Sequence, residues 1–358
     1  MLHVLVLVDD YKGSSFIQSR NKYYKEQGIF VSVLDCTISC DYEMDGIDVL
    51  TKKTYQNSEK NYDVLVVHAP NLRHHFVFIK RFGSRFKRFV FFFHGHEVVR
   101  INKTYPAPYD YMSESKWYSR LFQDIYDIIK LAVWHFYFPS VASKSDFIFV
   151  SYSFFEEFKH FTRLTEEKLN YSTHVINNPV GIDFLQNSYN SSKKKEFDII
   201  TVRSDMDSSV YCIDLCMKIA EKNPDVRFLI IGKGNWFKYN KKPNNVTWIN
   251  SYLSHVQLMS YIDISRCALM LTRRDTQGVM SCELVTYGIP LITSDLKVCH
   301  EIFDDLPNVF FLKDIDSFNG VYTDAIKKRD CASKTHRYDY EHTVQKEVDL
   351  LTDLGRRG

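Results

Sequence analysis

The sequence has almost no net charge and no long apolar run. Its 358 residues include 46 Lys and Arg against 44 Asp and Glu, a formal net charge of +2. This balance argues against a protein whose main partner is nucleic acid, because such proteins carry a clear basic excess. No apolar stretch reaches about 18 residues, the length that a membrane-spanning helix needs. We therefore expect a globular protein without a transmembrane helix.

Paired cysteines, a signal sequence and internal repeats are also lacking. The eight cysteines are scattered and include no CxxC pair, so we expect reduced thiols in a cytoplasmic protein. The chain begins Met-Leu-His-Val-Leu-Val-Leu-Val-Asp-Asp. It lacks the basic residues that open a signal peptide, and the run predicts a buried strand. The triplet Asp205-Met206-Asp207 follows a predicted strand. We interpret it as a solvated turn, and we expect no metal and no cofactor.

What the sequence does contain is a regular alternation of apolar strands and helical segments. The strands lack polar alternation, which is typical of parallel sheets covered on both faces. In the first half they are predicted at 3–9, 29–34, 63–68, 89–94, 146–151 and 173–176, and in the second half at 197–202, 227–231, 246–249, 268–271 and 291–293. The pattern predicts an α/β protein of two Rossmann-like domains, in which ligands bind at the carboxyl ends of the strands.

A polar stretch divides the two halves. Residues 185–196 contain few core-forming side chains and three consecutive lysines, so we predict a linker there. The first domain then comprises residues 1–184 and the second 197–335. Residues 336–358 are predicted to form a helix that packs back toward the first domain.

The stretch 271–301 is the most informative about chemistry. A predicted strand runs into a loop with Gly278, and a helix follows through Val279 and Met280. Glycine permits close backbone approach, and the start of a helix offers unpaired N–H groups to an anion. Asp275 lies on the loop and Glu283 about one turn inside the helix. Carboxylates beside an anion site repel the anion and are better suited to accept hydrogen bonds from sugar hydroxyls.

This stretch resembles the retaining glycosyltransferases of the GT-B fold, in particular glycosyltransferase family 4. That family has an acidic residue, seven further residues, a glutamate, and then a Gly-x-Pro turn. Here the pattern is Asp275, residues 276–282, Glu283 and Gly288-Ile289-Pro290. The first acid is usually glutamate, so Asp275 is one methylene shorter. The resemblance implies two facing Rossmann-like domains with the donor held mainly by the second.

Other parts of the second half match the family less completely. Asn178 lies in a segment similar to the family's Asn-Gly-Val-Asp. Arg203 takes the place of an arginine that contacts the donor diphosphate, but Val202 replaces the preceding glycine and Ser208 stands where a lysine is usual. Lys233, Arg273 and Arg274 are the cations that would compensate. Gly232 and Gly234 form a Gly-x-Gly that resembles the approach to the nucleotide base; a tight turn without a ligand is the alternative.

In the first half, Phe93-His94-Gly95-His96 resembles the family's strand ending in His-Gly. The resemblance implies that His94 donates to the transferred sugar or to phosphate, a role that neutral imidazole fills at pH 7. The alternative is a histidine that caps a strand end; His68 is expected to be structural. Gly13-Ser14 resembles the small-residue loop that closes over the transferred sugar.

A basic and aromatic stretch at 73–88 and an apolar helix predicted at 117–138 complete the pattern. Surfaces of this kind dock on anionic lipid headgroups, although a solvated basic face over a packed helix remains an alternative.

The resemblance implies transfer of a sugar from a nucleotide diphosphate sugar to an acceptor hydroxyl with retention of configuration. Asp275, Glu283 and His94 are the expected catalytic residues. Arg203, with the N–H groups at 278–280, is expected to stabilise the leaving diphosphate. Glu283 would hold ribose hydroxyls and Asp275 the sugar ring, and no protein base or metal is assigned.

The resemblance to the family also implies a glycan acceptor that is linked to a polyprenyl diphosphate. We expect the enzyme to extend this glycan for O-antigen or capsule at the inner face of the plasma membrane. Two other functions stay open. One is a nucleotide-sugar epimerase, which needs no acceptor. The other is a non-catalytic subunit that binds the nucleotide sugar, consistent with Val202, Ser208 and Asp275.

Overall fold

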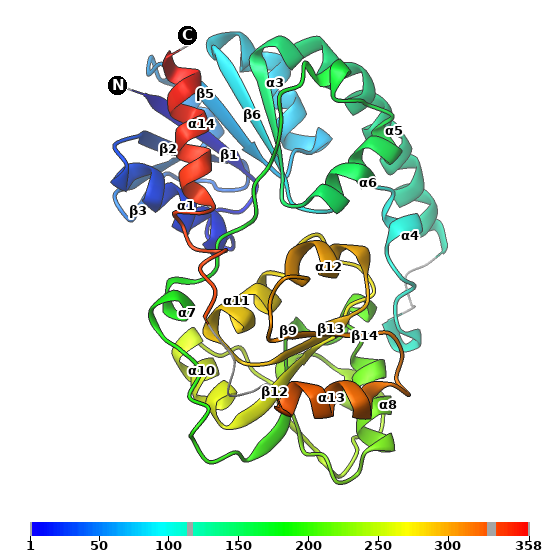
Figure 1. The fold of residues 1–358 in the computed structure, drawn as a ribbon. Coiled ribbons are helices and arrows are strands. Elements are labelled where there is room, and N and C mark those ends of the chain that lie inside the picture. Colours follow the sequence, from blue (N-terminus) through cyan, green and yellow to red (C-terminus); the bar gives the residue numbers. More distant parts are fainter. Residues whose placement is uncertain (1, 113–116, 328–333, 357–358) are drawn as a thin grey trace. The chain divides into compact units, whose positions relative to one another are not determined.

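The computed structural model describes residues 2–112, 117–327 and 334–356, with the side chain of Trp117 excepted. The chain forms two compact units (Figure 1). Unit 1 comprises residues 1–100, 125–179 and 340–358, and unit 2 comprises residues 101–124 and 180–339. Unit 2 therefore includes a stretch from the first half of the chain.

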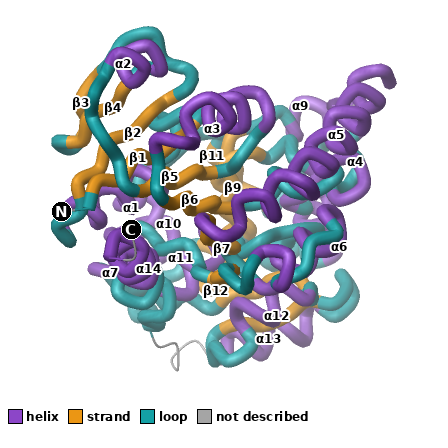
Figure 2. Tube along the Cα trace, turned by 90° about the horizontal axis from the view of Figure 1, so that it is seen from above, coloured by secondary structure: helices purple, strands orange, loops and turns teal. Residues whose placement is uncertain are grey.

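Unit 1 is built on an eight-stranded sheet in the order β3-β4-β2-β1-β5-β6-β7-β8. Its strands are β1 (His3–Val8), β2 (Phe30–Asp35), β3 (Tyr42–Met44), β4 (Ile47–Leu50), β5 (Val64–His68), β6 (Arg88–Phe93), β7 (Ser145–Phe149) and β8 (Thr173–Val175). All neighbours pair in parallel except β3 and β4, an antiparallel pair at the end of the sheet beside β2 (Figure 2). The central strands are almost completely buried, as apolar parallel strands require.

Helices of unit 1 pack on this sheet. They include α1 (Ser15–Glu26), α2 (Lys52–Asn57), a π-helical turn (Leu72–Phe76), α3 (Val77–Phe82), α6 (Tyr152–Thr162) and α14 (Val344–Arg356). The helix α14 lies against α1, where Arg20 Nε and Glu347 Oε1 form a fully buried ion pair at 3.1 Å. The last predicted helix is thus present, although it begins at Val344 and not near residue 336.

The longest helix is α5 (Trp117–Val141). It starts in the stretch assigned to unit 2 and continues into unit 1. Among the described residues, no helix is long and apolar enough to cross a membrane.

Unit 2 has a six-stranded, wholly parallel sheet in the order β11-β10-β9-β12-β13-β14. The strands are β9 (Phe197–Asp205), β10 (Phe228–Lys233), β11 (Val246–Ile249), β12 (Ser265–Met270), β13 (Leu291–Ser294) and β14 (Val309–Leu312). The helices are α4 (Ile101–Thr104), α7 (Ile182–Gln186), α8 (Ile213–Lys222), α9 (Trp236–Tyr239), α10 (His255–Asp263), α11 (Val279–Tyr287), α12 (Lys297–Phe303) and α13 (Phe318–Lys327). Separate apolar clusters contain inward-facing residues of this sheet and its helices. The α/β prediction is confirmed.

Residues 101–112, which we call the strap, lie on the strand-end loops of unit 2. Tyr109 donates to Asp214 at 2.9 Å and Tyr111 donates to Asp207 at 2.7 Å. The ring of Tyr109 also meets Trp236 edge-on, with centroids 4.5 Å apart. The strap thereby connects the segments that follow β9 and β10.

Candidate active site in unit 2

Arg203 lies within β9, two residues before its end, and its side chain is 8% exposed. Nη2 donates to the carbonyl of Leu271, just after β12, and the guanidinium lies 4.9 Å from the centre of the Tyr211 ring. Nε is buried and has no hydrogen-bond partner among the described residues. Burial lowers the pKa of Arg203, but guanidinium stays protonated in proteins. A fixed, partly unsatisfied cation therefore stands at the carboxyl end of the sheet.

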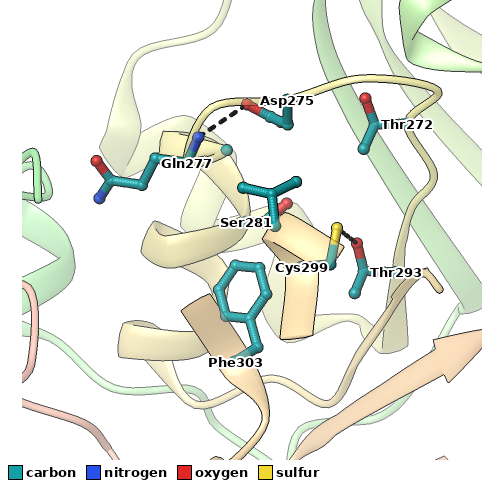
Figure 3. Close-up of a pocket in the computed structure, with 9 residues that line it drawn as sticks. Thr272, Asp275, Gln277, Ser281, Thr293, Cys299 and Phe303 are labelled. Atoms are coloured by element: carbon teal, nitrogen blue, oxygen red, sulfur yellow. Dashed lines mark hydrogen bonds between the residues drawn. The ribbon is translucent and has the colours of Figure 1, made fainter. Parts of the chain in front are cut away.

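Asp275 lies beside a small pocket at the start of α11 (Figure 3). Its Oδ1 accepts the N–H groups of Thr276 at 2.8 Å and Gln277 at 3.2 Å. Gly278 has φ +73°, and a Cβ there would lie 2.9 Å from Oδ2 of Asp275. The pocket is lined by Thr272, Asp275, Gln277, Gly278, Ser281, Thr293, Val298, Cys299 and Phe303. The loop thus folds tightly around one carboxylate, as the sequence pattern indicates.

Glu283 is 6% exposed and does not line this pocket. Its Oε1 accepts the N–H of Gly181 at 3.1 Å. Burial raises the pKa of Glu283, while His255 and the Gly181 N–H act in the opposite direction. A Cβ at Gly181 would lie 2.9 Å from His255 Nδ1, so this glycine lets the backbone reach the buried carboxylate. Sequence reasoning missed His255, because its contact depends on a distant loop.

The Gly-x-Gly at the end of β10 has a packing explanation. A Cβ at Gly232 would lie 2.1 Å from the Arg203 carbonyl oxygen, and one at Gly234 would lie 2.8 Å from the Cβ of Met206. Between them, exposed Lys233 places Nζ 4.4 Å from the centre of the Tyr252 ring. Close approach to β9 explains Gly232, and close approach to the turn after β9 explains Gly234. Contact of either glycine with a nucleotide stays a prediction.

The other arginines proposed for the diphosphate have protein partners. Arg273 forms two bonds with Asp214, at 2.9 and 2.6 Å, and Arg274 donates to Tyr105 at 2.9 Å. Ser208, which stands in the lysine position, is half-buried and precedes a short 3-10 turn.

The carboxylates of Asp205-Met206-Asp207 hold a turn together. Asp205 accepts the N–H of Asp207 at 2.9 Å, and Asp207 accepts the N–H of Asn235 at 2.8 Å. Tyr111 of the strap donates to the same carboxylate of Asp207. These bonds account for both aspartates within unit 2.

In unit 1, His94 follows β6 and pairs with His68, with Nε2 of His94 3.0 Å from Nδ1 of His68. Its ring stacks on Phe92 and meets Phe16 edge-on. Burial lowers the pKa of His94 well below 6.5, and the charge of Arg20 adds to this effect. The imidazole is therefore neutral at pH 7, as its predicted role requires.

The loop after β1 in unit 1 holds Gly13 and Ser14. The N–H of Gly13 donates to Asp10 Oδ1 at 2.9 Å, and Ser14 Oγ donates to the Asp10 carbonyl at 2.6 Å. A Cβ at Gly13 would lie 2.2 Å from Asp10 Oδ2. Gly13, Ser14 and His94 belong to unit 1, whereas every other predicted site residue belongs to unit 2. Their roles toward a sugar stay predictions.

Comparison with solved structures identifies the class of fold. Sucrose-phosphate synthase from Thermosynechococcus elongatus matches with a TM-score of 0.67 at 10% identity, covering 100% of both chains. HepE from Anabaena, solved with UDP and glucose, matches with a TM-score of 0.63 at 13% identity, covering 99% of this chain and 100% of that one. WaaG, a glycosyltransferase of lipopolysaccharide biosynthesis, matches with a TM-score of 0.60 at 11% identity, covering 98% and 100%. The chain has the GT-B fold.

Comparison with sequence families gives a match in the second half of the chain. Residues 189–342 match the family "Glycosyl transferases group 1", so this part of the chain carries a glycosyltransferase group 1 domain. The O-antigen biosynthesis glycosyltransferase WclY of Escherichia coli is 28% identical over 124 residues, which is 33% of this chain. The match spans 34% of that relative's length.

Proposed function

We propose that the protein transfers a glycosyl group from a nucleotide diphosphate sugar to an acceptor hydroxyl, with retention as in glycosyltransferase family 4. The carrying observation is the loop at the start of α11, where Asp275, Gly278 and buried Glu283 lie within the group 1 domain. The fold is shared with a structure that holds UDP and glucose, which supports a nucleotide-sugar donor.

The cation of Arg203 is suited to the leaving diphosphate. Its guanidinium is fixed, and its Nε has no partner within the described chain, so the group is preorganised for developing negative charge. Such preorganisation is the arrangement that lowers a barrier most. The N–H groups of Val279 and Met280 begin α11 and supply further donors. In this proposal the departing phosphate oxygen takes the proton of the acceptor, and the donor site needs no metal.

The two carboxylates have different tasks in this proposal. Asp275 is half-exposed beside the pocket and accepts from hydroxyls of the sugar ring, whereas Glu283 accepts from ribose hydroxyls. The bond from Gly181 fixes one oxygen of Glu283. Neutral His94 of unit 1 donates to the transferred sugar.

We further propose that the acceptor is a lipid-linked glycan of O-antigen or capsule biosynthesis, and that the protein works in the cytoplasm at the membrane surface. The names of two similar proteins, WclY and WaaG, concern O-antigen and lipopolysaccharide. The exposed apolar residues of α5 give this proposal physical support: Leu121, Phe122, Ile125, Ile128, Ile129 and Phe136.

The test measures nucleotide release from UDP-, GDP-, ADP- and TDP-sugars, with and without a polyprenyl-diphosphate-linked sugar. We expect slow release from one donor, acceleration by the acceptor, and an α-linked product from an α-linked donor. Glu283→Gln keeps the volume and removes the charge, so turnover should fall by about 10²-fold or more, in the range for loss of one preorganised polar group. Glu221→Gln, on the exposed surface of α8, is the matched control.

Three other outcomes would indicate a different function or a different stereochemistry. A donor that is isomerised without transfer would indicate an epimerase. Binding of a nucleotide sugar without turnover under any condition would indicate a binding subunit. An inverted product would remove the assignment of retention while leaving glycosyl transfer intact.

A further inference from the structure

Three residues far apart in the sequence meet at one edge of the sheet of unit 1. β1 and β2 are parallel neighbours with Val8 opposite Asp35, so Asp9 and Cys36 are the next residues of two adjacent strands. The N–H of Cys36 donates to the carbonyl of Val8 at 2.9 Å. His75 arrives from the segment after β5, the strand on the other side of β1. This is the edge at which parallel sheets bind ligands.

The segment that positions His75 has an unusual backbone conformation. Ala69 has φ +49°, and Leu72–Phe76 form a π-helical turn capped by Asn71, which accepts the N–H of His74 at 2.9 Å. π turns are rare and occur often at functional sites. The His75 side chain is 1% exposed; its Nε2 lies at ion-pair distance from Asp9, whereas its Nδ1 has no hydrogen-bond partner among the described residues. A buried ring nitrogen without a hydrogen bond is costly, so the burial of Nδ1 needs an explanation.

A cation would supply that explanation. Nε2 of His75 lies 3.2 Å from Asp9 Oδ1, and one ligand atom from each of Asp9, Cys36 and His75 lies within 4.8 Å of the others. The Asp9 carboxylate is oriented from outside this group, because His74 Nδ1 lies 2.9 Å from Oδ1 and Asn71 donates to Oδ2 at 2.8 Å. Outer partners of this kind fix the ligands of metal sites.

We propose that Asp9, Cys36 and His75 form a binding site for a transition-metal ion of the Zn²⁺ class. An imidazole, a thiolate and a carboxylate make a mixed N, S and O set, which suits Zn²⁺, whereas Mg²⁺ and Ca²⁺ prefer oxygen alone. The thiolate and the carboxylate together cancel the charge of the ion, and the thiol proton of Cys36 is released to solvent on binding. Three protein ligands leave a fourth position for water or an oxygen ligand. The wide separation of these residues hides the site from any search by motif spacing.

The test uses the full-length protein, stripped with a chelator and titrated with Co²⁺. Cobalt coordinated by a thiolate gives charge-transfer absorption in the near ultraviolet. Cobalt bound elsewhere without a thiolate ligand does not give this absorption. We expect this absorption to saturate at one equivalent and to be displaced by Zn²⁺. Cys36→Ser should abolish it, while Cys40→Ser, a nearby exposed cysteine, should keep it.

A second variant tests the residues that orient the Asp9 carboxylate from outside the site. Asn71→Ala should weaken the Zn²⁺ affinity by about 10–100-fold in competition with a chromophoric chelator, the usual cost of losing an outer partner. Absence of thiolate absorption in the wild type, its persistence in Cys36→Ser, or its loss in Cys40→Ser would each overturn the proposal. The readout is independent of glycosyl transfer.

Discussion

At the scale of single residues, two glycines of unit 2 form a matched pair. Gly278 has φ +73° and no room beside Asp275, whereas Gly320 lies in α13, where a Cβ would meet no described atom within 4 Å. Gly278→Ala should lower the free energy of unfolding by about 1–2 kcal/mol, the cost of left-handed backbone. Gly320→Ala should raise it by about 0.5–1 kcal/mol, because alanine loses less entropy in a helix. Urea unfolding measures both, and changes of the same sign would contradict the argument.

His94 gives a pH prediction. Burial holds its pKa well below the ordinary 6.5, with Arg20 and His96 adding to the effect. As the pH falls past 6.5, the unfolded chain takes up a proton at this residue and the folded protein does not. Stability present above pH 6.5 is therefore lost as the pH falls, by at most about 1.4 kcal/mol per pH unit.

Chemical unfolding at a series of pH values checks this prediction. Subtracting the free energy of His94→Gln from that of the wild type should give a curve that falls below pH 6.5 and is flat above it. His96→Gln, at an exposed neighbouring position, should leave the wild-type slope in place. A flat difference curve throughout would show that His94 titrates alike in both states.

At the scale of elements, α5 carries an exposed apolar stripe. Phe136 is 75% exposed and Ile129 52%, and the basic residues Arg73, Lys80 and Arg81 lie exposed on the neighbouring π turn and α3. The two segments are in contact, since the rings of Phe76 and Trp134 lie 5.7 Å apart. Apolar side chains flanked by cations are the combination that anionic bilayers attract.

We predict that the protein floats with vesicles containing anionic lipid. The double variant Phe136→Ser and Ile129→Ser should reduce binding by at least about tenfold, because each apolar side chain contributes about 1.5–3 kcal/mol when buried. Val256→Ser on α10, also strongly exposed, is the control. Binding that is unchanged in the double variant would remove α5 as the docking surface.

Local patterns predicted most elements, and the misses have identifiable causes. β3 and β4 are short and half-exposed, so they lack the apolar runs of the central strands, although Asp45-Gly46 between them is a hairpin turn signal. β9 continues past its predicted end at Val202 because Lys233 of β10 pairs with Asp205. Arg203 therefore lies inside a strand and not after one.

The part of the candidate site that is formed by consecutive residues could be predicted from the sequence. The Asp275 and Gly278 loop follows from a few consecutive residues. The N–H of Gly181 reaches Glu283 across 102 positions, and Tyr109 reaches Asp214 across 105. No periodicity encodes such contacts, because they depend on which loops the assembled sheet brings together.

At the scale of the whole molecule, the strap makes unit 2 depend on the first half of the chain. Tyr109→Phe with Tyr111→Phe keeps both rings and removes two hydrogen bonds to carboxylates, so it should cost about 1.5–3 kcal/mol per bond as an upper limit. Thermal unfolding measures the loss, with Tyr239→Phe as the control because that residue is 64% exposed. If the double variant were as stable as the control, the strap would contribute packing alone.

The buried pair of Arg20 and Glu347 has a consequence for synthesis on the ribosome. The partners are 327 positions apart, and Arg20 is fully buried in finished unit 1. Until α14 has emerged, α1 lacks the helix that packs against it and Arg20 lacks its carboxylate partner, so unit 1 is completed only at that point. All of unit 2, strap included, has left the ribosome by then. Domains usually fold in the order of synthesis, but here the second unit is completed first, and a nascent chain lacking its last helix exposes an open first unit to proteases.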